Sequence, residues 1–211
     1  MIILQSERLL IRNFQVSDWK SLHEIIIKYQ ESEFAPYDQQ WPTSNEEIVK
    51  ITEWFANGDS YLAVCIKELK RLIGFVGLIP EKEGEGIYNI GYVFDHDYHR
   101  QGYATEACRA VLHNAFGQLN AYKIITGTAS VNLPSIKLLE GLGFHKIGEE
   151  KASFKKDENG KPIEFIGYQF VLTRDEWNDE NKKSRSTSGG SGRDEYTRRS
   201  PFRSAFAGER A

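Results

Sequence analysis

The sequence has few of the residues that build disulfide frameworks or metal sites. It contains two cysteines and five histidines among 211 residues. Cys65 lies in an apolar run that predicts a strand, and Cys108 lies on the apolar side of a predicted helix. Both are therefore expected to be buried as small hydrophobic side chains, with no disulfide and no metal site. Such cysteine usage is typical of a reducing compartment.

The sequence also lacks a strong net charge and any long apolar run. Its formal net charge is -3, and over the first 180 residues the basic side chains are interspersed with acidic ones, so no basic stripe indicates nucleic acid. No apolar stretch is long enough to cross a bilayer, and the first residues do not have the pattern of a signal peptide. We expect a cytoplasmic protein with neither a nucleic-acid nor a membrane partner.

The length and composition indicate one domain, residues 1–183, followed by an extension. Residues 184–192 are rich in serine and glycine, as in flexible linkers, and residues 193–211 are rich in arginine without a periodic apolar pattern. We interpret residues 184–211 as a disordered or vector-derived extension. The alternative is a tethered peptide that docks on the domain.

Apolar periodicity predicts an α/β (α+β) fold with a largely antiparallel sheet and helices on both faces. Ser17 and Asp18 are expected to cap the first helix, and Ser44 with Glu47 forms a capping box for the second. The predicted order is strand 8–14, helices 19–29 and 44–56, strands 61–66, 72–79 and 87–94, a helix from 103 to about 117, strand 123–129, helix 133–142, and strands 144–153 and 163–172.

The most informative stretch is His99–Ala107, which places Gly102 between an apolar strand and a helix. The unpaired N–H groups and the positive dipole end of a helix N-terminus favour a phosphate, and glycine lets an anion approach the backbone. The stretch is neither a P-loop nor a dinucleotide fingerprint, because it lacks the Gly-Lys-Ser/Thr and the further glycines of those motifs. By itself such a stretch is more often an ordinary strand-to-helix turn.

Three blocks in order resemble the GNAT superfamily of CoA-dependent N-acetyltransferases, in particular the ribosomal-protein N-terminal (alanine/serine) acetyltransferase branch. They are Glu7–Arg12, the stretch Ile90–Tyr92 with His99–Ala107, and Asn132–Phe144. The likeness covers roughly residues 6 to 175. It implies a mixed sheet with a splayed central strand pair, and acyl-CoA bound in the cleft between those strands.

The resemblance implies acetyl-CoA as the donor and CoA as a product. Backbone N–H groups of the turn would hold the pyrophosphate, the strand edge would pair with the pantetheine amides, and Asn132 would anchor the pantetheine arm. The implied cofactor-binding residues are Val93, Phe94, Arg100, Gln101, Gly102, Tyr103, Ala104, Thr105 and Asn132.

For catalysis, the resemblance implies that Ser135, near Asn132, assists the leaving thiolate. Helix capping is the alternative role for both residues. The chain departs from the family at two positions: Leu139 stands where many members carry a tyrosine general acid, and Asn89 stands where many members of the branch carry a glutamate. The catalytic candidates are therefore Ser135, Asn132 and Tyr88, with Glu33 or a water chain as other proton acceptors and His96 and His99 expected as surface residues.

The acceptor is expected to enter beside two acidic segments, residues 31–41 and 81–85. Acidic segments favour a cationic amine such as a peptide N-terminus, a polyamine or an aminoglycoside, although they are equally typical of solvated loops. The predicted substrate-binding residues are Glu33, Phe34, Tyr37, Trp41 and Asn89.

The predicted function is transfer of an acetyl group from acetyl-CoA to a primary amine, by direct attack in a ternary complex. The acceptor would be a small molecule or a protein N-terminus, and a homodimer is compatible with the pattern. The alternative is a noncatalytic acyl-CoA-binding module or sensor on the same fold, because the glutamate and tyrosine are missing.

Overall fold

The computed structural model describes residues 2–82 and 84–183. The predicted extension at 184–211 lies outside these described residues. Among them, no helix is both long enough and apolar enough to cross a membrane.

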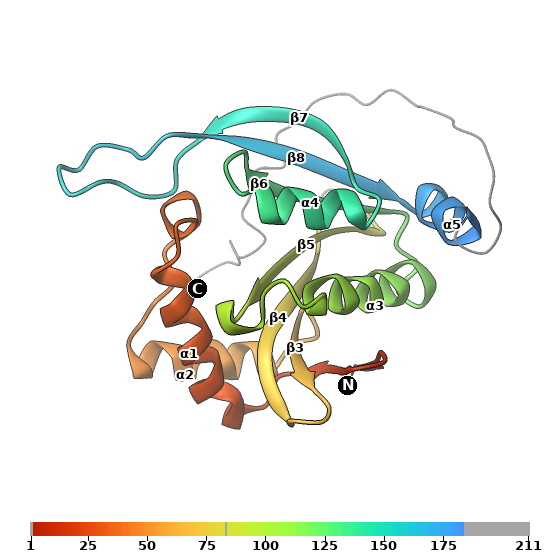
Figure 1. The fold of residues 1–211 in the computed structure, drawn as a ribbon, viewed down its shortest axis with the longest axis horizontal. Coiled ribbons are helices and arrows are strands. Elements are labelled where there is room, and N and C mark those ends of the chain that lie inside the picture. Colours follow the sequence, from red (N-terminus) through yellow and green to blue (C-terminus); the bar gives the residue numbers. More distant parts are fainter. Residues whose placement is uncertain (1, 83, 184–211) are drawn as a thin grey trace.

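One eight-stranded sheet organises the molecule (Figure 1), in the order β1-β2-β3-β4-β5-β6-β8-β7. Every neighbouring pair is antiparallel except β5 and β6, which are parallel. The predicted largely antiparallel sheet is therefore confirmed. The strands are β1 (Ile3–Gln5), β2 (Leu9–Asn13), β3 (Tyr61–Ile66), β4 (Arg71–Pro80), β5 (Ile87–Phe94), β6 (Lys123–Ala129), β7 (His145–Ala152) and β8 (Phe165–Thr173).

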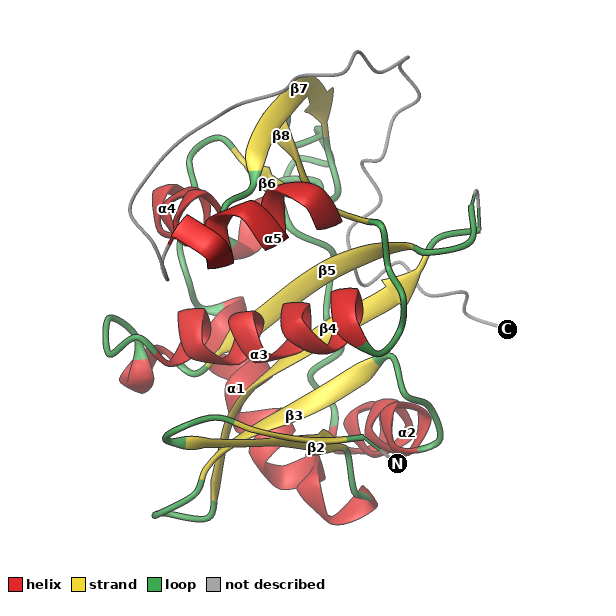
Figure 2. Ribbon diagram, turned by 90° about the vertical axis from the view of Figure 1, so that its right-hand side faces the viewer, coloured by secondary structure: helices red, strands yellow, loops and turns green. Residues whose placement is uncertain are grey.

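Helices cover both faces of the sheet, as predicted; Figure 2 shows α3 in front of it and α1 behind it. One apolar cluster joins α1 and α2 to one face, and a second joins α3, α4 and α5 to the other. The helices are α1 (Trp19–Gln30), α2 (Asn45–Ala56), α3 (Tyr103–Gly117), α4 (Leu133–Gly141) and α5 (Arg174–Lys183), with short 3-10 turns η1 (Val16–Asp18), η2 (Ala35–Tyr37) and η3 (His96–Tyr98).

The helix caps agree with the prediction in one case and differ in another. Ser44 accepts a hydrogen bond from the Glu47 backbone and caps α2. Asp18 occupies the N-cap position of α1, as predicted, but its side chain makes no cap bond there. The Asp18 carboxylate instead accepts two hydrogen bonds from Arg12. This ion pair connects β2 to the start of α1.

Two elements, β1 and α5, were absent from the prediction. β1 is only three residues long and forms an exposed edge. α5 is rich in charged residues, and among its described side chains Trp177 is the one buried, packing on Phe116 and His113 of α3. A single apolar side chain in a polar segment leaves no helical periodicity to detect.

The fold opens a gap between β5 and β6. The two strands pair over only three residues each, ending at Asn89 and Ile125, although β5 continues to Phe94 and β6 to Ala129. Beyond that point β5 stays paired with β4, and β6 stays paired with β8. The predicted splayed central pair is thus confirmed.

Candidate active site between strands β5 and β6

The gap exposes one edge of β5. Its last link to β6 is a buried hydrogen bond of 2.7 Å from Thr126 Oγ1 to the Ile90 carbonyl. The amide of Asp95 donates to Ile73 of β4, at 2.8 Å. The backbone N–H and C=O groups of successive strand residues point to alternate sides. Because those of Asp95 face β4, the backbone groups of Phe94 and Tyr92 point into the gap.

This alternation separates the two strand residues predicted to bind the cofactor. Val93 pairs with Phe75 of β4, and its side chain is buried in the core beneath α1 and α2. Its backbone therefore faces β4, so of the predicted pair only Phe94 presents its backbone to the gap. The Phe94 carbonyl accepts a hydrogen bond of 3.0 Å from His99 Nε2.

The loop after β5 ends at the N-terminus of α3. Gly102 caps this helix in the left-handed region, with φ 82°, and Arg100 also has a positive φ of 59°. The amides of Tyr103, Ala104 and Thr105 occupy the first helical turn, where no intrahelical carbonyl is available to them. These predicted cofactor-binding residues thus form one group of N–H donors at the end of the gap.

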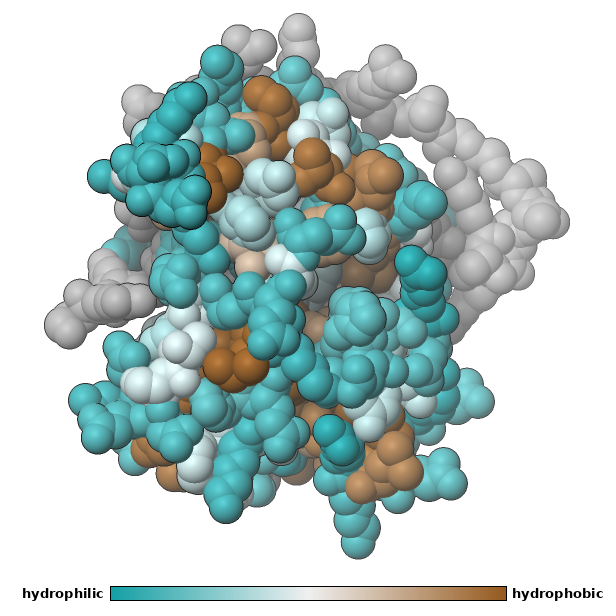
Figure 3. All heavy atoms as spheres, turned by 60° about the vertical axis from the view of Figure 1, so that its left-hand side comes forward, coloured by the Kyte–Doolittle hydropathy of each residue, from teal (hydrophilic) through white to brown (hydrophobic). Residues whose placement is uncertain are grey.

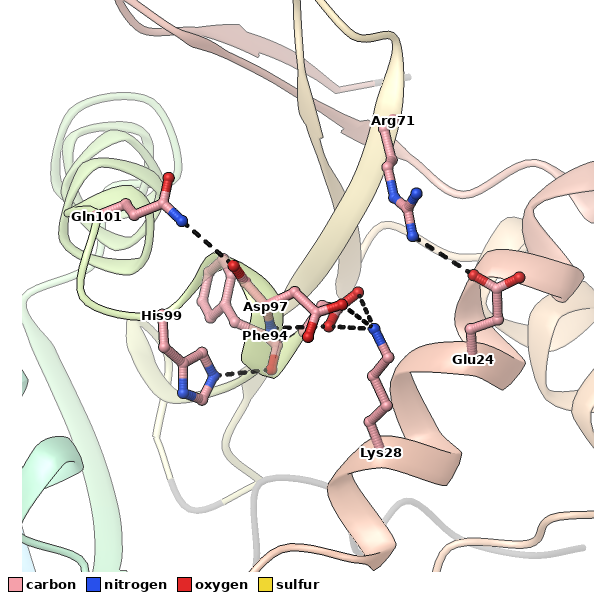
Figure 4. Close-up of polar contacts among 8 residues, drawn as sticks. Glu24, Lys28, Arg71, Phe94, Asp97, His99 and Gln101 are labelled. Atoms are coloured by element: carbon pink, nitrogen blue, oxygen red, sulfur yellow. Dashed lines mark hydrogen bonds and ion pairs between the residues drawn. The ribbon is translucent and has the colours of Figure 1, made fainter.

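Side chains hold this loop from outside (Figure 4). Lys28 of α1 lies 2.8 Å from the buried Asp95 carboxylate and 2.6 Å from Asp97. The Lys28 hydrogen bond lowers the pKa of Asp97, and the Asp95 hydrogen bond raises the pKa of Lys28. Gln101 donates to the Asp97 carbonyl at 3.2 Å. The loop is therefore tied both to itself and to α1.

Across the gap, the start of α4 carries the predicted catalytic pair. Asn132 Oδ1 accepts from the Ser135 amide at 3.1 Å, so Asn132 caps α4. The Ser135 hydroxyl lies 2.8 Å from the hydroxyl of Tyr92, which reaches over from β5. Burial raises the pKa of Tyr92, and the Ser135 hydrogen bond opposes this shift.

Tyr92 was missed by the sequence reasoning. Along β5 the side chains of Tyr88, Tyr92 and Phe94 pack toward the cluster of α3 and α4. The period-two alternation of a strand placed Tyr92 on that face, but its meeting with Ser135 joins positions 43 residues apart. No local pattern carries that information.

A family model described as an acetyltransferase (GNAT) domain matches residues 8–145. The chain belongs to the GNAT family. Within it, the chain is 28% identical to the uncharacterized N-acetyltransferase YnaD of Bacillus subtilis (strain 168) over 177 residues, which cover 83% of this chain and 99% of the relative. The protein is accordingly an acetyl-CoA-dependent N-acetyltransferase.

Solved GNAT structures share the fold. The ribosomal-protein-S5-alanine acetyltransferase from Vibrio fischeri superposes with a TM-score of 0.67 at 20% identity, covering 84% of this chain and 99% of that one. The spermidine N-acetyltransferase from Vibrio cholerae, in complex with CoA and spermine, superposes with a TM-score of 0.68 at 17% identity, covering 82% and 99%. At these identities the two likenesses show the shared fold.

At the point where β5 and β6 part, Asn89 is 3% exposed. Its side-chain oxygen is buried and has no hydrogen-bond partner among the described residues. Tyr88 packs against the cluster of α3 and α4, so its side chain is on the other face of the strand from Asn89. The structure therefore separates these two predicted site residues.

The segment between α1 and α2, residues 31–44, meets the β7–β8 hairpin on the remaining side. Tyr37 packs edge-on against Phe165, with ring centroids 5.6 Å apart. Lys155 of the hairpin donates to Gln30 at 3.1 Å. Burial lowers the pKa of Lys155, and the charge of Asp38 opposes that shift. These contacts place the segment 31–44 beside the β7–β8 hairpin, although the two are far apart in the sequence.

The other predicted substrate-binding residues have different positions. Glu33 is exposed and Phe34 is half-buried. Trp41 is 7% exposed and packs on Phe75, with ring centroids 5.8 Å apart, so it belongs to the core under α1 and α2. Figure 3, which brings the left-hand side of Figure 1 forward, shows apolar side chains as separate patches among hydrophilic ones.

The remaining predictions concern histidines, cysteines and metal. His96 and His99 are exposed, in agreement with the expectation of surface residues. Cys65 and Cys108 are buried free thiols. The part of the chain that the structure describes contains no group of side chains suited to a metal ion.

Proposed function

We propose that acetyl-CoA binds along β5 and the N-terminus of α3, and that a primary amine attacks its thioester directly from the side of the α1–α2 segment. The observation that carries this proposal is the divergence of β5 from β6 next to the N–H donors of α3. An extended pantetheine arm can use the free strand edge as a partner strand would, while its pyrophosphate takes the helix N-terminus.

The donor half of the reaction uses residues from both sides of the gap. Backbone groups of Tyr92 and Phe94 would pair with the pantetheine amides, and N–H groups between Arg100 and Thr105 would hold the pyrophosphate. Asn132 would support the arm from the α4 side. A backbone N–H of β5 near the thioester would stabilise the negative charge that develops on its oxygen.

The acceptor nitrogen must arrive as a neutral amine. The ordinary pKa is about 8 for a peptide N-terminus and about 10 for an alkylamine, so a proton has to leave before attack. We assign Asn89 the role of orienting the amine, because its buried, unpartnered oxygen can accept an N–H bond. An amide cannot take the proton itself, so the proton would pass to water at the exposed side near Glu33.

In the chemical step the amine nitrogen forms a bond to the acetyl carbon and the bond from that carbon to sulfur breaks. The nitrogen loses a proton to water, and the sulfur leaves as a thiolate that then takes a proton from water. Ser135 would donate a hydrogen bond to the sulfur while accepting one from Tyr92, which lies 2.8 Å behind it. This arrangement replaces the tyrosine that many relatives carry at the position of Leu139.

The test is thiol release from acetyl-CoA in the presence of a panel of amines, with the acetylated product identified by its mass. The panel contains peptides with free N-termini, polyamines and small monoamines. Amine-dependent thiol release supports the proposal. A comparison of the rates with peptides and with small amines identifies the acceptor class. Binding of acetyl-CoA without any acetylated product would favour the noncatalytic alternative.

Asn89 gives a sharper form of this test. Asn89→Ala should raise the KM for the amine and leave the Kd for CoA unchanged, because it removes only the acceptor for the amine N–H. Asn89→Glu supplies a carboxylate base and should shift the rise of kcat/KM to lower pH. An unchanged amine KM in Asn89→Ala would contradict the assignment.

A further inference from the structure

The turn between β1 and β2 is joined to the first turn of α3 by a compact polar cluster. Ser6 Oγ and the backbone amide of Arg8 donate to Glu106 Oε1, at 2.7 and 2.8 Å. The Arg8 side chain contacts the other carboxylate oxygen through Nε and Nη2, each at 2.7 Å. Both oxygens of Glu106 are therefore occupied, and the cluster fixes α3 against the edge of the sheet.

The Arg8 guanidinium also reaches the loop that precedes α3. Its Nη1 donates to the carbonyl of Gln101 at 3.0 Å, and its Cζ atom lies 4.3 Å from the centre of the Tyr103 ring. A side chain at position 102 would meet Arg8 Nη2 at 3.3 Å. Arg8 is thus packed directly beneath the turn that holds the left-handed Gly102.

The bond to Gln101 sets the direction of the next amide. In a trans peptide the carbonyl of one residue and the N–H of the following residue point to opposite sides. The structure contains no cis peptide bonds among the described residues. Because the Gln101 carbonyl is held toward Arg8, the N–H of Gly102 points away from the guanidinium. We infer that this N–H joins the unpaired amides of the first turn of α3 as an anion-binding group.

The same cluster removes an electrostatic conflict. A carboxylate in the first turn of α3 would repel a bound pyrophosphate if its charge were unbalanced. Burial disfavours ionised Glu106, but hydrogen bonds from the Arg8 backbone, Ser6 and the Arg8 side chain outweigh burial and lower the pKa of this carboxyl. Glu106 stays ionised, and the positive charge of Arg8 compensates it.

We propose that Arg8 is a positioning residue of the donor site, which aims the Gly102 amide at the CoA pyrophosphate by holding the Gln101 carbonyl. This inference rests on the pyrophosphate placement made under the proposed function. Arg8 acts through the loop and touches no reacting atom, so its removal should weaken the binding of ligands that carry a pyrophosphate and spare those that do not.

The test compares Arg8→Gln with Arg12→Gln, a matched control four residues later, on β2. Arg12 forms a similar two-contact pair with Asp18, at 2.7 and 2.9 Å, but does not touch the loop. Calorimetry measures the Kd of CoA, dephospho-CoA and pantetheine for each protein. We expect Arg8→Gln to weaken CoA and dephospho-CoA by about tenfold alike and to leave pantetheine unchanged, as for loss of a charge-assisted hydrogen bond.

Glu106→Gln keeps the shape of the cluster and removes its negative charge. It should show the same selectivity with a smaller loss, and the double variant should lose less than the product of the two single losses, because both residues act through one contact chain. Thermal unfolding of each variant separates a loss of fold from a loss of loop geometry.

Two results would overturn the inference. Equal weakening of all three ligands by Arg8→Gln would make Arg8 a stabiliser of the fold alone. Weakening of CoA without weakening of dephospho-CoA would make Arg8 a contact of the 3′-phosphate. If instead the unmodified protein binds pantetheine as tightly as CoA, the pyrophosphate placement itself is wrong, and that failure is distinct from the other two.

Discussion

We call β5 with the loop before α3 the donor wall, and Asn89 with residues 30–44 the acceptor wall. They differ in their side-chain hydrogen bonds, although the donor wall also keeps the unpaired backbone amides of α3. On the donor wall, the carbonyls of Phe94, Asp97 and Gln101 each accept a side-chain hydrogen bond. On the acceptor wall, buried polar atoms of Gln30, Ser32 and Asn89 have no hydrogen-bond partner within the described ranges.

This difference matches the ligands that the two walls would receive. Acetyl-CoA is the same donor in every turnover, so its site can be rigid. A loop that is ordered before the ligand binds lowers the entropic cost of binding. Unpartnered buried groups are costly in the free protein, and a ligand that satisfies them regains that cost on binding. Specificity for the amine is thus expected to depend on the acceptor wall, and affinity for the cofactor on the donor wall.

The largest loss of CoA affinity is expected from a substitution at Gly102, in the donor wall. Gly102→Val places a β-branched residue at a φ of 82°, which only glycine adopts readily, and we expect the Kd of CoA to rise at least about a hundredfold. Gly117→Val is the control, since a side chain at the other end of α3 meets nothing within 4 Å. Unchanged CoA binding in Gly102→Val would refute the pyrophosphate placement.

The brace between α1 and the donor loop gives the next effect. Lys28→Gln leaves the buried Asp95 carboxylate without its cation, and we expect the free energy of unfolding to fall by about 2 kcal/mol in urea titrations. Arg71→Gln breaks an exposed pair with Glu24 at 3.7 Å and should cost less than about 0.5 kcal/mol. Equal losses in both variants would show that Asp95 does not need Lys28.

The pair that spans the gap, Ser135 and Tyr92, is tested through the leaving group. Ser135→Ala should lower kcat by about tenfold with little change in the KM for acetyl-CoA, and Tyr92→Phe by less. The thiolate of an acetyl thioester with a more acidic thiol depends less on a hydrogen bond from Ser135, so the loss in kcat should be smaller with that thioester. Ser130→Ala, on the turn before α4, is the control, and a loss independent of the thiol would contradict the assigned role.

The smallest effect is expected on the acceptor wall. Tyr37→Ala removes the ring that packs on Phe165 and should raise the KM for the amine by about threefold, leaving the Kd of CoA unchanged. Leu69→Ala, at an exposed site on the turn between β3 and β4, serves as the control. A change in CoA affinity without a change in amine KM would erase the distinction between the two walls.

Much of the fold could be predicted from local patterns. Strands 61–66, 87–94 and 123–129 have the predicted bounds, because each is an apolar run between strong turn signals. The cap of α2 by Ser44 and the stop at Gly143, with φ 93°, also follow from local chemistry. The family blocks further identified the loop before α3.

The parts that were missed depend on the pairing of distant segments. Which β5 residues face the gap follows from the register with β4, and this register directs the backbone of Tyr92, and not of Val93, into the gap. Trp41 and Tyr37 are both aromatic residues of one segment, yet the first packs on Phe75 and the second on Phe165. Composition alone cannot tell such neighbours apart.

The parallel contact of Ile87–Asn89 with Lys123–Ile125 has a consequence for folding. These three residue pairs are the backbone ladder between β1–β5 and the three C-terminal strands, and they close a loop that contains α3. So short a non-local ladder is expected to form late, and the C-terminal strands are expected to open before the rest in native-state hydrogen exchange. A cofactor held by β5 and by the start of α4, which follows β6, would slow that opening as its concentration rises. Amide exchange in β6–β8 would then report cofactor binding even when no acetyl group is transferred.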